Sequence, residues 1–263
     1  MQSGLIPVPE MAPAPLVIGG MHRSGTSLTA STLQAAGLDI GQRLMGPYPG
    51  NPRGHFEDLD FVDLHREALR ANGLPDHGLV PEPGSPRLDG AFRAQALHLV
   101  ATRGLLGHPW GFKDPRTVLF LDCWNTLLPA ARWLLVFRHP LACIDSLLRR
   151  DATDHRLPPT DALRVWTHYN SVLLTFAQAH PSRVLLIDIE TLINTPRRVL
   201  QGVRTHLGLP LTDSASCYEP SLFHAPPAEL ADVRPYALAE ALDLFSALTA
   251  NTSVLPEPAA PQA

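Results

Sequence analysis

The residues best suited to chemistry lie near the start of the chain, where an apolar run leads into a loop of glycine and hydroxyl residues. The run Leu16-Val17-Ile18 has the composition of a buried strand, and a helical pattern follows through Leu28 and Leu33. The loop between them reads Gly20-Met21-His22-Arg23-Ser24-Gly25-Thr26-Ser27. A strand, loop and helix in this order aim backbone N–H groups and a helix N-terminus at one point, where an anion is favoured. The sequence therefore predicts a phosphate-binding loop, whose glycines let the backbone approach the ligand closely.

The spacing of the loop tests which phosphate ligand is meant. In the nucleoside-triphosphatase pattern G-x-x-x-x-G-K-[ST], Gly20 and Gly25 fill the glycine positions and Ser27 the last one. Thr26 replaces the lysine that reaches the β- and γ-phosphates, which argues against ATP or GTP chemistry. Arg23 supplies a cation inside the loop and suits a charged group at the 5′ end of a nucleotide. The alternative is a glycine-rich turn that binds nothing.

A second candidate anion site follows a later strand. Arg138 comes directly after the apolar run 132–137, and Ser146 lies eight residues further on, inside the next helical pattern. Eight residues are slightly more than two helical turns, so the serine can face the side from which the arginine reaches. The alternative is an arginine that merely pairs with a carboxylate.

These motifs together resemble those of sulfotransferases that use 3′-phosphoadenosine-5′-phosphosulfate (PAPS) and release the bisphosphate PAP. The loop is similar to the arginine-containing type found in tyrosylprotein and many bacterial carbohydrate sulfotransferases, and the resemblance extends over residues 16–208. It implies that Arg138 and Ser146 bind the 3′-phosphate. It also implies that the 5′-phosphosulfate is bound by the loop residues Arg23, Ser24, Gly25, Thr26 and Ser27.

The resemblance also assigns catalytic roles. The corner Lys113-Asp114-Pro115-Arg116 is similar to the family's K-D-P corner, which implies that Lys113, with Arg23, stabilises charge on the leaving phosphate. We interpret Asp114 as a helix cap. Arg116 has two open interpretations. It either contacts the sulfuryl group or an acidic acceptor, or it pairs with Asp114.

The general base is sought in the segment after the first helix. Glu57 is the first candidate, because arginine-loop members of the family use a glutamate placed after that helix. His55 is the alternative, since a histidine with a pKa of about 6.5 suits the same role. Asp58 and Asp60 are interpreted as residues that start the next helix. A third interpretation is that Glu57 is only an acid of the first helical turn, favoured there by the helix dipole.

The acceptor site is expected to be lined by two irregular segments rich in proline and glycine, 47–54 and 72–90. Tyr48, Phe56 and His77 are available there for stacking or hydrogen bonds. By analogy, the expected partner is a hydroxyl of a sugar or a natural product. The sequence does not indicate the oligomeric state.

The remaining elements predict an α/β fold, with a central parallel sheet flanked by helices in a three-layer, P-loop-like arrangement. Besides the first strand, the patterns predict strands at 110–113, 132–137 and 184–188. Helices are predicted at 59–72, 91–106, 116–128, 141–150, 161–180, 196–207 and 235–250. Because ligands bind beyond the carboxyl ends of such strands, we expect Arg23, Lys113 and Arg138 to converge at one edge. One domain is expected over 15–253, between disordered tails at 1–14 and 254–263.

Composition limits the class of protein. The 263 residues carry a formal net charge of −4, which argues against nucleic acid as a main partner. Three separated cysteines argue for a reducing compartment and against a cysteine-rich metal site. The sequence shows no secretory signal pattern and no apolar run long enough to span a membrane, so we expect a cytoplasmic protein. A sulfuryl group in transfer carries a single formal negative charge, so we also expect a reaction that needs no metal.

Two other functions stay open. A P-loop small-molecule kinase with an altered loop would use Asp188, at the end of Val184-Leu185-Leu186-Ile187, as its Walker B acid. A nucleotide-binding module without catalytic activity would keep the loop and lose the chemistry.

Overall fold

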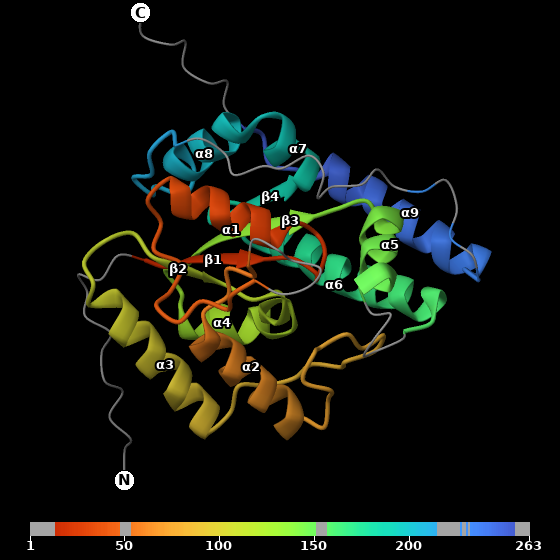
Figure 1. Ribbon diagram of the computed structural model, residues 1–263, viewed down its shortest axis with the longest axis horizontal. Coiled ribbons are helices and arrows are strands. Elements are labelled where there is room, and N and C mark those ends of the chain that lie inside the picture. Colours follow the sequence, from red (N-terminus) through yellow and green to blue (C-terminus); the bar gives the residue numbers. More distant parts are fainter. Residues whose placement is uncertain are drawn as a thin grey trace, which may run out of the picture.

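The computed structural model describes residues 14–47, 54–150, 157–214, 227, 230 and 232–255, and shows an α/β fold built on a parallel sheet (Figure 1). The strands are β1 (Leu16–Gly19), β2 (Gly111–Lys113), β3 (Arg132–Phe137) and β4 (Val184–Asp188). Their order is β2-β1-β3-β4, and every neighbouring pair is parallel. The predicted fold class is confirmed. Strand β1, which leads into the glycine loop, lies between two other strands.

The helices lie on both faces of this sheet (Figure 1). They are α1 (Thr26–Ala35), α2 (Leu59–Ala71), α3 (Ala91–Gly104), α4 (Leu121–Leu127), α5 (Pro140–Arg150), α6 (Pro159–Ala179), α7 (Ile189–Asn194), α8 (Pro196–Thr205) and α9 (Pro235–Ala250). A 3₁₀ helix, η1 (Pro115–Phe120), precedes α4. In the described part of the chain, no helix is both long and apolar enough to cross a bilayer.

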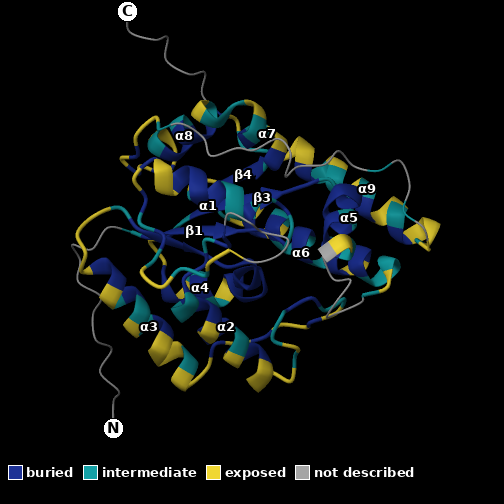
Figure 2. Ribbon diagram, in the orientation of Figure 1, coloured by how far each residue is buried: buried dark blue, intermediate teal, exposed yellow. Residues whose placement is uncertain are grey.

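The core is divided by the sheet into two hydrophobic clusters. Successive strand residues point to opposite faces, so Leu16 and Ile18 pack with α1, α7 and α8, whereas Val17 packs with the helices of the other face. Trp133 and Leu134 of β3 divide between the clusters in the same way. Figure 2 shows the strands buried and the outer sides of the helices exposed. Such double coverage is what the continuous apolar strands require.

Two elements differ from the prediction. The helix predicted over 116–128 begins instead as η1, and α-helical geometry starts only at Leu121. All six residues of η1 are buried, so tertiary contacts rather than an amphipathic stripe set their winding. Helix α7 was not predicted; it is only six residues long and is capped by the Asp188 carboxylate, which accepts a hydrogen bond from the backbone N–H of Glu190.

Some predictions fall outside the described residues. These are the greater part of both predicted tails and Tyr48. The described chain ends at Leu255, whose side chain is buried against the α8 side of the sheet.

Candidate active site

The glycine loop is shaped by close contacts with the neighbouring strands and helices. A Cβ atom on Gly20 would lie 2.4 Å from the carbonyl oxygen of Val136, so only glycine fits beside β3. Gly25 has a φ of +91° and caps α1, and a Cβ atom there would lie 2.5 Å from side-chain carbons of Ile189. Arg23 itself has a φ of +70°. The loop therefore turns tightly into the N-terminus of α1, the geometry expected of an anion cradle.

The two predicted anion motifs are in direct contact. Arg23 donates from Nε to Oγ of Ser146 over 3.0 Å, and Arg138 donates from Nη1 to the carbonyl of Arg23 over 3.3 Å. The indole N–H of Trp166 donates to the carbonyl of Arg138 over 3.1 Å and so fixes the end of β3. Burial lowers the pKa of the Arg138 guanidinium, because desolvation disfavours the charged form.

A buried thiol joins the loop to α5, and sequence reasoning missed it. Cys143 donates from Sγ to the carbonyl of His22 over 3.2 Å, and the same sulfur lies 3.7 Å from Oγ of Ser24. Burial raises the pKa of this thiol, which keeps its proton in place for donation. The two partners are 121 and 119 residues away in sequence, and no local pattern indicates the contact.

Lys113 and Glu57 form a buried ion pair beside the loop. Lys113 Nζ lies 2.6 Å from Oε1 of Glu57 and 3.4 Å from Oγ of Ser27. Burial lowers the pKa of Lys113, and the negative charge of Glu57 opposes that shift. Nδ1 of His55 lies 4.0 Å from Oε1 of Glu57, and Ser27 donates to the backbone carbonyl of His55. Both candidate bases and the candidate lysine are thus brought to the start of α1.

Arg116 stands on the other side of the same carboxylate. Its Nη1 lies 2.8 Å from Oδ1 of Asp114 and 3.9 Å from Oε2 of Glu57, and its Nε donates to the carbonyl of Asp76 over 2.8 Å. Of the two interpretations of Arg116, the structure shows the pairing with Asp114. Asp114 also accepts from the backbone N–H of Arg116, as expected of a helix cap. The phenol of Tyr169 donates to the carbonyl of Gly78, so the segment after Asp76 is held at two points.

The segment that carries Glu57 is tied to α3 by an arginine that the sequence did not indicate. Arg103 donates to Asp58 over 3.1 and 2.7 Å and to Asp60 over 2.7 Å, and its side chain is 5% exposed. Asp58 also caps α2, as predicted. The backbone N–H of Met45 donates to the carbonyl of Glu57 over 2.8 Å. These contacts fix the main chain at the glutamate and immediately after it.

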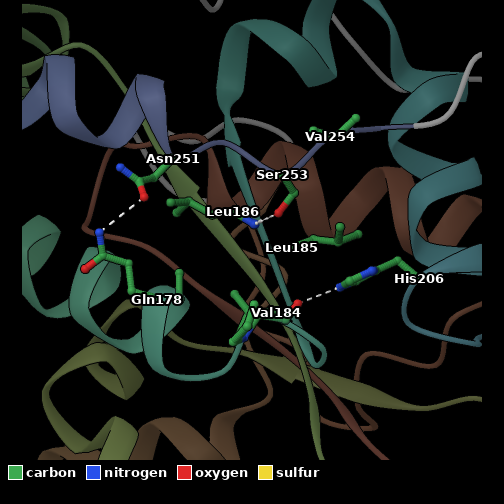
Figure 3. Close-up of a pocket in the computed structure, with 10 residues that line it drawn as sticks. Gln178, Val184, Leu185, Leu186, His206, Asn251, Ser253 and Val254 are labelled. Atoms are coloured by element: carbon green, nitrogen blue, oxygen red, sulfur yellow. Dashed lines mark hydrogen bonds between the residues drawn. The ribbon is translucent and has the colours of Figure 1, made fainter.

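A separate cavity of about 380 Å³ lies at the outer edge of β4, where Ser253 hydrogen-bonds the backbone of Leu186 (Figure 3). It opens at the amino end of that strand, whereas the loop, Lys113 and Arg138 follow the carboxyl ends of theirs. Its lining residues are Ala177, Gln178, Pro181, Val184, Leu185, Leu186, His206, Asn251, Ser253 and Val254. None of these ten is a lysine, an arginine or a carboxylate, so this cavity does not suit an anionic donor. Within the described ranges, no group of three or more His, Cys, Asp or Glu side chains is placed to hold a metal ion.

Comparison with known proteins agrees with this geometry. A family model described as "Sulfotransferase family" matches residues 15–213. A Caenorhabditis briggsae protein named "Putative protein-tyrosine sulfotransferase" is 24% identical over 200 residues, which are 74% of this chain and 65% of that protein, so the match spans slightly less than two thirds of the relative.

Two solved structures share the fold. The sulfotransferase domain of the Synechococcus PCC 7002 olefin synthase has a TM-score of 0.54 at 17% identity, covering 97% of this chain and 100% of that one. A sulfotransferase from Alicyclobacillus acidocaldarius has a TM-score of 0.51 at 14% identity, covering 91% and 94% respectively. The glycine loop, the strand order and the family match over residues 15–213 lead to one conclusion: this chain belongs to the sulfotransferase family.

Proposed function

We propose that the protein transfers the sulfuryl group of PAPS to a hydroxyl of a small-molecule or carbohydrate acceptor, as an enzyme of the EC 2.8.2 type. The observation that carries this proposal is the junction at Ser27, a residue of the anion loop whose hydroxyl lies 3.4 Å from Lys113 Nζ. Lys113 is in turn paired with Glu57. A candidate anion site and a candidate acid–base pair therefore share one corner of the sheet.

The residues present fit the donor. A glycine-shaped cradle at the start of α1 suits the 5′-phosphosulfate, and Arg23 with the hydroxyls of Ser24, Thr26 and Ser27 would hold it. Arg138 and Ser146 would hold the 3′-phosphate. Because Arg138 is buried and its pKa is lowered, an anion beside it would restore the stability of its charge. When bound, PAPS supplies an activated sulfuryl group and a phosphate leaving group.

Glu57 is the proposed general base, and Lys113 controls it. In the structure the Glu57 carboxylate is occupied by the Lys113 ammonium group, whose Nζ lies 2.6 Å from Oε1. Movement of Lys113 Nζ toward the donor would place the cation where negative charge develops and would leave Glu57 free to accept the acceptor's proton. Arg116, held by Asp114, would stay beside the carboxylate. His55 is the alternative base, and it lies on the same side of Glu57 as Lys113.

The acceptor would lie between the segment of Glu57 and the segment that begins at Asp76. Phe56 and His77 belong to these two segments, and Arg116 joins them by its contacts with Glu57 and the Asp76 carbonyl. A sugar or a natural-product alcohol is the proposed class. A tyrosine-containing peptide belongs in the same screen, because the C. briggsae relative is named for that substrate.

A P-loop kinase is the alternative function. Its Walker B acid would be Asp188, which in the structure caps α7 through the N–H of Glu190 and lies on β4, with β3 between it and the loop strand. Thermal unfolding separates the two functions. A ligand at 100 times its Kd stabilises a protein by about 2.7 kcal/mol, so PAP should raise the Tm by several degrees and ATP with Mg²⁺ should not. The reverse result would overturn the proposal.

Transfer itself is measured with ³⁵S-labelled PAPS and a panel of sugars, natural-product alcohols and a tyrosine peptide. The expected product is a labelled sulfate ester that forms with wild-type protein and is lost with Arg23→Ala. A protein that binds PAP and labels no member of a broad panel would instead be a non-catalytic nucleotide-binding module.

A further inference from the structure

A chain of hydrogen bonds runs behind the candidate active site, and two of its members, Trp124 and His65, belong to no sequence motif. The indole N–H of Trp124 donates to Nε2 of His65 over 2.8 Å, and Nδ1 of His65 lies 2.9 Å from Oδ2 of Asp114. The other oxygen of Asp114 accepts from the Arg116 guanidinium over 2.8 Å. The side chains of Trp124, His65 and Asp114 are fully buried. The chain therefore connects the α4 core to a guanidinium at the active site.

The direction of both bonds at His65 is determined by Trp124. An indole N–H can only donate, so Nε2 of His65 must accept and carries no proton. The ring proton is then on Nδ1, which donates to Asp114. Asp114 must accept at that oxygen, and it also accepts from Arg116 at the other. Trp124 thus selects the His65 tautomer that suits an ionised aspartate.

Electrostatics agree with this assignment. Burial alone would raise the pKa of Asp114, but the positive charge of Arg116 and the hydrogen bond from His65 hold that pKa below its ordinary value. Burial likewise acts to lower the pKa of Arg116, and the negative charges of Asp114 and Glu57 raise it instead. The pair is stable in its charged form because each end is also hydrogen-bonded.

We propose that Trp124, His65 and Asp114 are positioning residues that hold the Arg116 guanidinium between Glu57 and the segment beginning at Asp76. This inference rests on the proposed function only for the reaction that Arg116 would serve. Arg116 Nη1 is 3.9 Å from Glu57 Oε2, and Nε donates to the Asp76 carbonyl, so one rigid guanidinium contacts both sides of the proposed acceptor site. A fixed guanidinium would keep Glu57 in place while Lys113 exchanges its partner.

The test compares two substitutions of His65. His65→Leu removes the donor to Asp114, whereas His65→Asn keeps it, because the amide Nδ2 can occupy the place of the ring Nδ1. We expect amide hydrogen exchange in residues 76–80 to become about tenfold faster in His65→Leu, and to stay within about twofold of wild type in His65→Asn. The Nε–H resonance of Arg116 should lose its protection from water in the first variant and keep it in the second. A ¹⁵N spectrum of the wild-type His65 ring should show the proton on Nδ1.

A matched control is provided by Trp133. Its indole Nε1 is buried and has no hydrogen-bond partner among the described residues, so Trp133→Phe removes a similar group without breaking a bond. Trp124→Phe should accelerate exchange in residues 76–80, and Trp133→Phe should not.

Activity and donor binding give independent readouts. Calorimetry with PAP should give the same Kd for wild type and His65→Leu within about twofold, because Arg23 and Arg138 do not belong to this chain of hydrogen bonds. The kinetic assay uses as substrate the member of the acceptor panel that wild-type protein labels. With this substrate, kcat should fall about 10- to 100-fold in His65→Leu and recover in His65→Asn.

The proposal would be overturned if His65→Leu left the Arg116 resonance and the exchange of residues 76–80 unchanged. It would also be overturned if His65→Asn behaved like His65→Leu, or if PAP affinity fell as far as in Arg23→Ala. Failure of the proposed function would look different, because the wild-type protein would then fail to bind PAP or would bind it and label no acceptor. The exchange and resonance results would still show whether the hydrogen-bonded chain positions Arg116.

Discussion

The buried pair of Lys113 and Glu57 makes a quantitative prediction about stability. The side chains are 1% and 7% exposed and are joined by a 2.6 Å contact, so removing one partner leaves the other charge in the core. Loss of one member of a buried pair costs about 3–5 kcal/mol, whereas an exposed pair contributes about 0.2–1 kcal/mol. We therefore expect Glu57→Gln to cost about 3–5 kcal/mol.

The two single variants should differ. In Lys113→Met, Glu57 keeps the Arg116 guanidinium at 3.9 Å, so this substitution should cost less than Glu57→Gln. The double variant removes both charges and should lie within about 1 kcal/mol of wild type, because it leaves neither member of the pair as an uncompensated charge in the core. With an unfolding entropy of about 2.1 cal/mol/K per residue, a 263-residue chain loses about 7 °C in Tm for 4 kcal/mol.

The pH dependence provides a second check on the same pair. Burial holds the folded-state pKa of Lys113 below its unfolded value, so the folded protein binds fewer protons than the unfolded chain between those two values. Stability must therefore rise with pH across that window. The rise in stability with pH should be largest in Glu57→Gln, which lacks the charge that opposes the pKa shift of Lys113. The contribution of Lys113 to this rise should be absent from Lys113→Met.

The assay is denaturant unfolding of the four proteins at neutral and alkaline pH, with the coupling energy taken from the cycle. A coupling below about 1 kcal/mol would refute the reasoning, because it would show that the pair behaves like an exposed one. A double variant less stable than Glu57→Gln would refute it as well.

Four further predictions concern the site. Gly25→Ala should destabilise the protein by more than Gly37→Ala: both residues have positive φ, but a Cβ atom at Gly25 meets Ile189 at 2.5 Å and one at Gly37 meets nothing within 4 Å, so equal losses in thermal unfolding would contradict the loop packing. Arg23→Ala should weaken PAP binding about tenfold or more by calorimetry, since a charge-assisted hydrogen bond contributes about 1.5–3 kcal/mol, while Arg43→Ala at an exposed position should not. Glu57→Gln should lower kcat by at least about tenfold with PAP affinity near wild type, and the assignment of the base is wrong if His55→Ala has this effect instead. Activity should survive dialysis against EDTA. If activity were lost on dialysis and recovered when Mg²⁺ was added, a reaction stabilised by Arg23 and Lys113 alone would be contradicted.

Much of the fold followed from local pattern. Strands β3 and β4 and helix α9 have the predicted bounds, because apolar runs and proline or aspartate boundaries specify such elements over a few residues. The glycine loop was readable for the same reason. The residue types at Glu57, Lys113 and Arg23 identified them as candidate site residues, although the sequence did not show that Lys113 and Glu57 pair directly.

The long-range contacts could not be predicted from the sequence. Arg103 reaches Asp58 across 45 residues, and Trp124 reaches His65 across 59. Neither pair has a spacing that a helix or strand repeats, and only the folded sheet brings them together. The winding of η1 was missed for a related reason, since all of its residues are buried and no periodic stripe distinguishes it from an α-helix.

The manner in which the segment after Asp76 is anchored has an evolutionary consequence. Arg116 and Tyr169 donate hydrogen bonds to the backbone carbonyls of Asp76 and Gly78 in this segment, and every amino acid has such a carbonyl. Other side chains of the segment can change while these two contacts persist, but Gly78 cannot, because its φ is +72° and a Cβ atom there would lie 3.0 Å from the Tyr169 hydroxyl. The backbone of the segment is thus positioned by atoms that substitution of its own side chains does not remove.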